Sequence, residues 1–331
     1  VLVKPSELTP RTSALLHEVL SKAFDEKVLA VVVGGVDTGE AFTRLPFDHL
    51  LFTGSTSVGR KVALAAAENL TPVTLELGGK SPAIIDDSAD LAKAAATIAH
   101  GKMFNAGQTC IAPDYILVSS RKRDAAIDAI TGAARDLFPS IDTTADYSAI
   151  VSDRHFARLK SMVEEARASG VRVVEVGSQN ALHPQRKMPL TLLVDPPASL
   201  RAMQEEIFGP VLPVVTVDGT DGVIRYVNER ERPLALYWFG QNARARDAVL
   251  ERTVSGGVTV NDTLWHVAQE NLPFGGVGKS GIGAYHGARG FDAFSHLKPV
   301  FYQSRFAQNT LVHPPYTTKT DQIIGLLRKI L

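Results

Sequence analysis

Short apolar runs that suit β-strands alternate along this chain with segments of helical periodicity. The first such runs cover residues 1–3, 28–33, 49–53 and 73–77. After the first run, Thr9 followed by Pro10 fits a helix start, and apolar residues recur at helical spacing as far as Phe24. Strands that are joined through helices pair in parallel, so the sequence predicts an α/β fold with doubly wound parallel sheets.

The same alternation continues beyond Gly78 and predicts a second sheet. Expected strands cover residues 115–118, 171–176, 190–194, 211–217, 234–239 and 257–260. Expected helices cover residues 123–137 and 153–168, and an earlier one opens at Ser88 or Asp90 and runs to about Phe104. Prolines indicate surface loops at His183-Pro184 and Asp195-Pro196-Pro197. A length of 331 residues fits about two domains.

Composition excludes several classes of partner. The chain has 35 basic and 35 acidic side chains, so it has no net charge that would attract nucleic acid or an anionic membrane. Its single cysteine excludes an internal disulfide and fits a reducing compartment. There is no apolar run long enough to span a bilayer and no signal-peptide pattern at the start. We therefore expect a cytoplasmic protein without nucleic-acid or membrane contact.

That single cysteine, Cys110, is also a candidate nucleophile. It follows Gly107 in a turn, and one helical pattern separates it from Glu76 at the end of a strand. A thiol becomes nucleophilic when a base is available, and a carboxylate can act as that base. The alternative interpretation is a small buried core residue, as many free cysteines are. The residues alone leave both interpretations open.

Several motifs resemble, in the right order, those of the aldehyde dehydrogenase superfamily. The resemblance rests on Glu76-Leu77-Gly78-Gly79-Lys80, Gly107-Gln108-Thr109-Cys110, Glu205-Glu206-Ile207-Phe208-Gly209-Pro210 and Pro273-Phe274-Gly275-Gly276-Val277-Gly278-Lys279-Ser280-Gly281. Four further motifs are similar to the branch that contains the class 3 and coniferyl aldehyde dehydrogenases. They are Ala112-Pro113-Asp114-Tyr115, Pro233-Leu234-Ala235-Leu236-Tyr237, Tyr285-His286-Gly287 and Phe294-Ser295-His296. The resemblance extends over essentially the whole chain.

The resemblance implies NAD(P)-dependent oxidation of an aldehyde to the carboxylic acid. Cys110 would attack the aldehyde to give a thiohemiacetal, and loss of hydride would leave a thioester. Glu76 would be the base that activates water for thioester hydrolysis, which near neutral pH requires burial to raise its pKa. The branch implies an aromatic substrate such as coniferyl aldehyde, or a medium- to long-chain aliphatic aldehyde. Trp265, His100 and Phe104 are candidates for lining the aldehyde channel.

The resemblance also implies that NAD is the cofactor, with NADP as the alternative, and no metal is expected. Gly54 and Ser55 match the pyrophosphate-binding turn at a helix N-terminus, where free N–H groups favour an anion. Lys4 and Glu7 match the residues that hold the adenosine ribose. Without the resemblance, the glycine turn would be purely structural and Lys4 and Glu7 would form a solvated turn.

Three further residues complete the cofactor set that the resemblance implies. Glu206 matches the residue that holds the nicotinamide ribose, Phe208 one that packs by the ring, and Gly78 belongs to the same set. The alternatives are a solvated pair at Glu205-Glu206 and a core position for Phe208.

By resemblance the chain divides into three parts. Residues 1–77 would be the C-terminal part of the NAD(P)-binding domain, and residues 78–270 the catalytic domain that carries the cysteine. Residues 271–331 would be a return segment. It would hold a strand near residues 294–301 that pairs with a neighbouring subunit in a homodimer, and an amphipathic tail at residues 322–331.

The part of the family pattern that precedes the position of Val1 is absent from the sequence. It contains the central strand of the nucleotide-binding sheet and an oxyanion-hole asparagine. The first domain is therefore expected to be incomplete at its N-terminus, and the chain by itself to be partly unfolded before Leu77. The alternative to an active dehydrogenase is a truncated remnant with at most binding or thioester or ester hydrolase activity.

Overall fold

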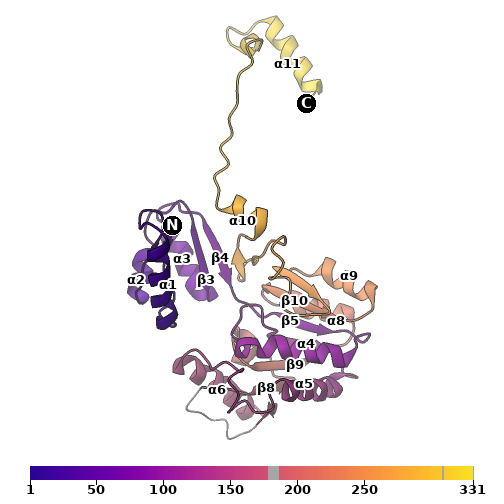
Figure 1. The fold of residues 1–331 in the computed structure, drawn as a ribbon. Helices are drawn as coiled ribbons and strands as arrows, with labels where there is room; N and C mark the ends of the chain where they lie inside the picture. The colour runs from indigo at the N-terminus through magenta and orange to yellow at the C-terminus, as the bar shows by residue number, and fades with distance from the viewer. Residues whose placement is uncertain (178–185, 308, 331) are drawn as a thin grey trace. The chain divides into compact units, whose positions relative to one another are not determined.

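The structure, a computed structural model, describes residues 1–177, 186–307 and 309–330 (Figure 1). The predicted loop at His183-Pro184 lies outside these residues. The chain divides into a unit from Val1 to Phe294 and a second unit from Ser295 to Leu331. The second unit contains η2 (Asn309–Val312) and α11 (Thr318–Ile330), which covers most of the predicted amphipathic tail. Among the described helices, none combines the length and the apolar character needed to cross a membrane.

The first part of the chain forms two small sheets. In one, β1 (Leu2–Val3) pairs in parallel with β2 (Ala30–Val31). In the other, β4 (Val73–Leu77) lies between parallel β3 (Leu50–Gly54) and antiparallel β12 (Gly281–Ile282), so the return segment adds a strand here. The helices of this region are α1 (Pro10–Ala23), α2 (Val36–Phe42) and α3 (Thr56–Ala67).

The prediction of a buried strand over residues 28–33 is wrong for this chain. Strand β2 is limited to Ala30–Val31, while Val28 is 59 % and Val33 54 % exposed. The apolar side of α1 is also open, with Leu15 59 % exposed. Within the described residues, β1 and β2 pair with each other and with no further strand. The apolar pattern is present, but the described chain leaves residues 29–32 only half-buried.

The larger sheet has the strand order β11-β10-β5-β6-β9-β8-β7, and every pair is parallel except β7 with β8. Its strands are β5 (Pro82–Ile85), β6 (Tyr115–Val118), β7 (Arg172–Val176), β8 (Leu190–Val194), β9 (Val211–Thr216), β10 (Ala235–Phe239) and β11 (Gly257–Val260). All of these were predicted except β5. Its first residue is Pro82, a position where a strand tolerates proline because no ladder N–H is needed there.

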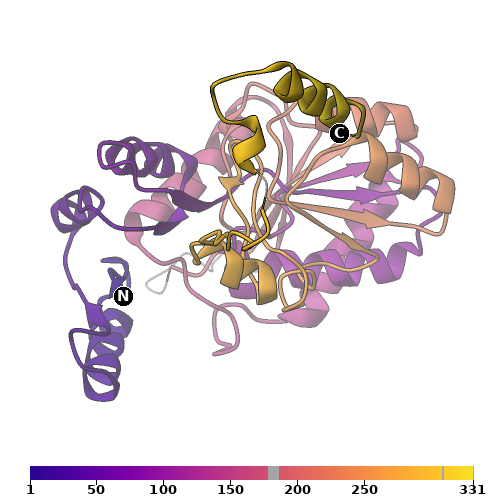
Figure 2. The ribbon, with the colours of Figure 1, turned by 90° about the horizontal axis from the view of Figure 1, so that it is seen from above.

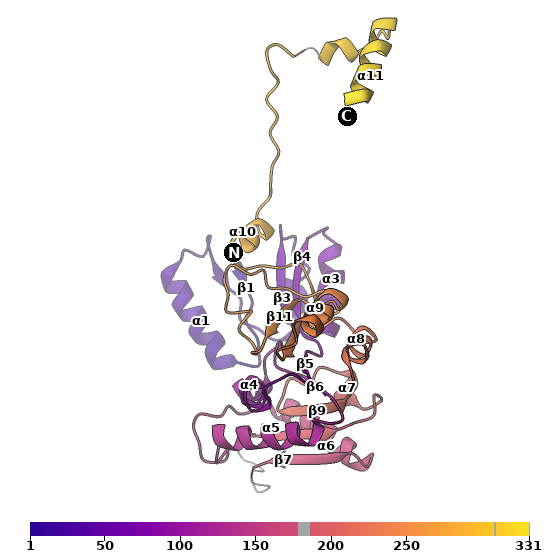
Figure 3. The ribbon, with the colours of Figure 1, turned by 90° about the vertical axis from the view of Figure 1, so that its right-hand side faces the viewer.

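Helices cover both faces of this sheet (Figures 2 and 3). They are α4 (Leu91–Met103), followed by η1 (Phe104–Gly107), then α5 (Arg123–Leu137), α6 (Asp153–Ala168), α7 (Arg201–Gln204), α8 (Thr220–Asn228) and α9 (Ala243–Arg252). Helix α10 (Gly287–Ala293) follows β12 instead. Alternate strand residues face opposite layers. Ile85 and Val118 pack in the cluster with α4, α5 and α6, whereas Ile84 and Trp238 pack with α8 and α9. Burial on both faces is why these strands are almost continuously apolar.

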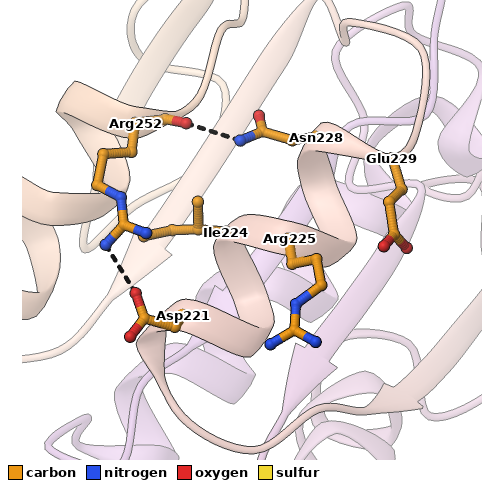
Figure 4. A pocket seen from close by; sticks show the side chains of 6 residues that line it. All are labelled: Asp221, Ile224, Arg225, Asn228, Glu229 and Arg252. Atoms are coloured by element: carbon orange, nitrogen blue, oxygen red, sulfur yellow. Dashed lines mark hydrogen bonds and ion pairs between the residues drawn. The ribbon is translucent and has the colours of Figure 1, made fainter.

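Helices α8 and α9 are joined by polar contacts (Figure 4). The Arg252 guanidinium lies 2.7 Å from the Asp221 carboxylate, and the Asn228 amide donates to the Arg252 carbonyl oxygen at 2.8 Å. A cleft of about 410 Å³ beside them is lined by Asp221, Ile224, Arg225, Asn228, Glu229 and Arg252. No residue that the sequence assigned to a site lines this cleft, so we attribute it to the packing of α8 on α9.

Strand order brings the predicted catalytic loops together. The Gly78–Lys80 loop precedes β5, the Cys110 loop precedes β6, and the turn with Glu206 precedes β9. Because β5, β6 and β9 are parallel neighbours, their amino ends lie along one edge of the sheet. Strand β4 leads directly into the first of these loops. Chain segments far apart in sequence therefore converge at this edge.

The separate β1–β2 pair should be much less stable than the large sheet, because a two-stranded sheet is marginal in water. In the 331-residue chain, we expect the amides of Ala30 and Val32, which bond Val1 and Val3, to exchange at least about tenfold faster than those of β9. Hydrogen exchange followed by mass spectrometry measures this directly. Equal protection of β2 and β9 would contradict the prediction.

Candidate active site

A buried ion pair between Lys80 and Asp114 ties the three loops together. The Lys80 ammonium contacts the Asp114 carboxylate and donates to the carbonyl oxygens of Ala202 at 2.7 Å and Glu205 at 3.1 Å. The second carboxylate oxygen of Asp114 accepts from the N–H of Ile207 at 3.0 Å. The two charged side chains are only 11 % and 4 % exposed. Sequence analysis missed both roles, although each residue lies in a quoted motif.

The loop that carries Cys110 turns in a way that only glycine permits. Gly107 has a φ of 73°, and a Cβ there would lie 2.4 Å from the carbonyl oxygen of Gly209. Gln108 then fastens the loop, because its amide donates to the carbonyl oxygen of Ala149 at 3.0 Å. Cys110 itself is partly buried and packs against the main core. It is therefore both a core neighbour and a reachable thiol.

Glu76 is held in the middle of a sheet. It lies on β4 with Thr53 of β3 on one side and Gly281 of β12 on the other. The residue is 6 % exposed, and among the described residues neither carboxylate oxygen has a hydrogen-bond partner. Burial raises the pKa of Glu76 to about 8. A carboxyl group with this pKa can take and release a proton near neutral pH.

The thiol and two carboxylates influence one another. Burial raises the pKa of Cys110 to about 11, and the charges of Glu206 and Glu76 add to this effect. Both carboxylates therefore lie within electrostatic reach of the sulfur. Burial also raises the pKa of Tyr285, with added effects from Glu76 and Cys110. Tyr285 thus belongs to the same site, and its sequence signal was the Tyr285-His286-Gly287 motif.

Glu206 packs directly on the Gly78–Gly79 backbone. A Cβ at Gly78 would lie 1.7 Å from a carboxylate oxygen of Glu206, so glycine is required there. Burial raises the pKa of Glu206 to about 8, the Asp114 charge adds to it, and a hydrogen bond from the Gly79 N–H opposes it. The alternative of a solvated pair therefore fits Glu205, which is exposed, but not Glu206.

Two neighbours of Glu206 are unusual. Phe208 adopts a φ of 49°, a left-handed conformation that costs a non-glycine residue about 1–2 kcal/mol. Lys102 on α4 is fully buried, and its ammonium nitrogen has no partner among the described residues. Burial lowers the pKa of Lys102 to about 8, against an opposing effect of Asp114. The pattern of α4 gave no signal that this lysine would face inward.

The other predicted cofactor residues are placed differently. Gly54 pairs with Leu77 in the β3–β4 register, so it adjoins the Glu76–Gly78 segment. Ser55 is the N-cap of α3 and accepts from the N–H of Val58 at 3.4 Å. Lys4 and Glu7 form an ion pair at 3.5 Å beyond the end of β1. No strand pairing in the described chain joins Lys4 and Glu7 to the rest of the set.

The proposed lining of the aldehyde channel gathers near the end of α4. The rings of His100 and Phe104 are 6.1 Å apart, and Phe104 is 52 % exposed. Trp265 is 59 % exposed on a loop that the Thr263 hydroxyl fastens to α4, by donating to the Thr97 carbonyl oxygen at 3.2 Å. These rings are therefore available to an apolar ligand.

Titration of Glu76 should be visible in stability. Its pKa is raised from 4.5 in the unfolded chain to about 8 in the folded state, so the folded state holds the proton more tightly. Its contribution to stability is therefore complete below pH 4.5 and is lost as the pH rises towards about 8. We expect the melting temperature of Glu76→Gln to rise relative to wild type between pH 5 and 8 and then to level off.

The matched control is Glu251→Gln, because Glu251 is exposed on α9. It should follow the wild-type melting curve at every pH. A Glu76→Gln curve parallel to that of wild type from pH 5 to 8 would show that the buried carboxyl group does not hold its proton in this range.

Comparison with known proteins agrees with this geometry. The aldehyde dehydrogenase family model matches residues 1–300. A "Probable coniferyl aldehyde dehydrogenase" from Caulobacter vibrioides is 53 % identical over 320 residues, which are 95 % of this chain and 66 % of that protein. The substrate-bound AldH of Staphylococcus aureus has a TM-score of 0.91 at 40 % identity, covering 98 % of this chain and 70 % of that one.

A further solved relative is the aldehyde dehydrogenase of Mycobacterium tuberculosis complexed with NAD+. Its TM-score is 0.81 at 32 % identity, covering 92 % of this chain and 64 % of that one. The present chain thus spans about two thirds of the length of the relatives it matches. The family model covers far more than half of the chain, and three of the expected motifs run into loops at the amino edge of the large sheet. The chain belongs to the aldehyde dehydrogenase family.

Proposed function

We propose that this protein oxidises an aldehyde to the carboxylic acid, with Cys110 as nucleophile and Glu76 as base. One observation carries the proposal: a buried carboxyl group with a pKa of about 8 lies within electrostatic reach of the chain's single thiol. A structural core cysteine would not need a buried carboxyl group without a partner beside it, because such a group costs stability. That cost is typical of a catalytic site.

The first step is attack by the sulfur of Cys110 on the aldehyde carbon. The thiol first loses its proton to water, because the thiolate is the nucleophile. The backbone N–H groups of Cys110 and Ile111 donate to the sulfur and oppose the rise in its pKa, so they stabilise the thiolate once it forms. The product is a thiohemiacetal on Cys110.

The residues present fit a nicotinamide cofactor, on the side of the thiol where Glu206 packs. The carboxylate of Glu206 on the Gly78–Gly79 cradle can accept hydrogen bonds from ribose hydroxyl groups, with Phe208 beside it. At the start of α3, Gly54 and Ser55 supply a helix N-terminus for a pyrophosphate.

Lys4 and Glu7 would hold the adenosine ribose. NAD, when bound, supplies the acceptor for the hydride that leaves the aldehyde carbon. The NAD+ complex of the Mycobacterium tuberculosis relative supports NAD as this cofactor.

The second step is hydrolysis of the thioester on Cys110. Ionised Glu76 takes a proton from water, which attacks the thioester carbon and releases the carboxylic acid. The proton then leaves the buried carboxyl group readily at neutral pH, because its pKa is close to that pH.

For the substrate we propose an aromatic aldehyde such as coniferyl aldehyde, with medium- or long-chain aliphatic aldehydes as the alternative. The name of the Caulobacter relative and the exposed rings of Phe104 and Trp265 support this. The division at residues 77/78 and 270/271, the homodimer and the cytoplasmic location stay predictions. The described residues 294–301 carry no strand, and the pairing predicted there needs a second subunit.

A second candidate is cofactor-independent hydrolysis of esters or thioesters. It is favoured by the separation of the β1–β2 sheet, which carries Lys4 and Glu7, from the sheets that carry the thiol and the base. Hydrolysis requires Cys110 and Glu76 and nothing from β1–β2. An ester substrate assayed with and without NAD separates this activity from aldehyde oxidation.

Replacing the nucleophile tests both activities. In a chain that contains residues 1–331 and turns over aldehyde, Cys110→Ala should reduce oxidation and ester hydrolysis by about 10⁴-fold or more. NAD affinity should stay nearly unchanged, because the sulfur is absent from the proposed cofactor contacts. Turnover that survives in Cys110→Ala would remove the thiol from the mechanism.

Replacing the base separates the two steps. Glu76→Gln should keep a fast first burst of NADH and slow the later steady-state rate by about 10²–10⁴-fold, since hydrolysis needs the base for water. In wild type the steady-state rate should rise with pH as Glu76 ionises around pH 8, and Glu76→Gln should lose this dependence. Equal losses of burst and steady-state rates would instead place Glu76 in thiol activation or positioning.

A further inference from the structure

Two side chains of helix α6 form hydrogen bonds to the backbone of the turn that carries Glu206. Arg158 donates to the carbonyl oxygen of Glu206 at 3.2 Å and also to that of Ile207. The ring nitrogen Nε2 of His155 lies 2.9 Å from the carbonyl oxygen of Phe208. A carbonyl oxygen only accepts, so this ring nitrogen carries the proton and donates. Three successive backbone carbonyl groups are thus bound from one helix.

The helix places both side chains on the face that contacts the turn. His155 and Arg158 are three residues apart, so they lie on the same face of α6. Leu159, the next residue along the helix, packs against Gly209. A Cβ at position 209 would lie 2.5 Å from a methyl group of Leu159. This tight packing fixes the distance between helix and turn.

These hydrogen bonds to α6 restrict the directions in which the side chains of the turn can point. While the carbonyl groups of residues 206–208 are bound to α6, the Glu206 carboxylate lies against Gly78 and the N–H of Gly79. The left-handed φ of 49° at Phe208 persists because its carbonyl oxygen is bound as well. Asp114 holds the N–H of Ile207 from the sheet side. The turn is therefore held by hydrogen bonds both from α6 and from Asp114.

We propose that His155 and Arg158 are positioning residues of the active site: they lock the Glu206–Phe208 backbone and thereby hold the Glu206 carboxylate on the Gly78–Gly79 cradle. The part of the proposal that concerns the cofactor rests on the proposed function of Glu206. The part that concerns the lock, meaning the fixing of the Glu206–Phe208 backbone by His155 and Arg158, does not rest on it. The lock can be measured in the chain without any ligand.

The lock is tested by hydrogen exchange on the 331-residue chain. Arg158→Met removes the donors to two carbonyl groups, and the amides of residues 205–209 should exchange about tenfold faster or more. His155→Leu should have a smaller effect in the same segment. Arg158→Lys and His155→Gln each keep one donor and should restore part of the protection.

The matched control is Arg154→Met on the same helix, because Arg154 is exposed. It should leave exchange in residues 205–209 unchanged. Melting curves show that each variant is folded, and protection of β9 should be the same in all of them. If Arg158→Met exchanges in residues 205–209 as slowly as Arg154→Met, the lock does not exist and the proposal fails.

The consequence for the cofactor is tested in a longer chain that contains these residues and turns over aldehyde. Arg158→Met should raise the KM for NAD by about tenfold and change kcat less, with partial rescue in Arg158→Lys. A change in kcat alone would overturn the positioning of Glu206. If the wild-type chain shows no NAD-dependent turnover, the proposed function fails, and the exchange experiment still decides whether the lock exists.

Discussion

The site depends on the ion pair between Lys80 and Asp114. All three donors of the ammonium group are used, because it contacts Asp114 and the carbonyl oxygens of Ala202 and Glu205. Burying two charges is costly, and the cost is offset here by complete hydrogen bonding of both groups. Removing one partner from such a pair costs about 3–5 kcal/mol. The relative positions of Glu76, Cys110 and Glu206 rest on this contact, since it joins the loops that follow or carry them.

Burial is the common cause of the electrostatics around Cys110. It raises the pKa of Glu76 and Glu206 to about 8 and that of the thiol to about 11. Acidic groups that are packed together hold their protons in the resting state, because a second negative charge is unfavourable there. Each proton can then be released when a bond forms. Of these groups, Glu76 has the pKa that the proposed base needs near neutral pH.

The site lies where the chain passes from β4 of the three-stranded sheet to β5 of the large sheet. Gly54, at the carboxyl end of β3, adjoins Leu77 through the register of β4. The chain then crosses through Gly78 and Gly79 to the amino edge of the large sheet, where Cys110 and Glu206 lie. Helix N-termini and strand carboxyl ends favour a nucleotide on the first side. The loops of the second side carry the proposed catalytic residue Cys110, and β12 pairs with β4, the strand that leads into the crossing.

The sequence by itself determined most of the elements and indicated the candidate reacting groups, because both are encoded locally. The strand at Val73–Leu77 and the helices at Arg123–Leu137 and Asp153–Ala168 matched prediction, since their periodicity lies within each segment. Cys110 and Glu76 were found through motifs of adjacent residues. Strand β5 was missed, because a proline followed by three apolar residues is too short a pattern.

Tertiary structure alone decided what is buried and which charges meet. Residues 28–33 have the pattern of a core strand, yet burial depends on a neighbour that the described chain does not supply. His155, Arg158 and Lys102 look in the sequence like any polar residues on helices, and only packing turns them inward. The contact of Lys80 with Asp114 spans 34 positions along the chain. No local pattern specifies such a pair, because its strength comes from the low dielectric that the folded layers create around it.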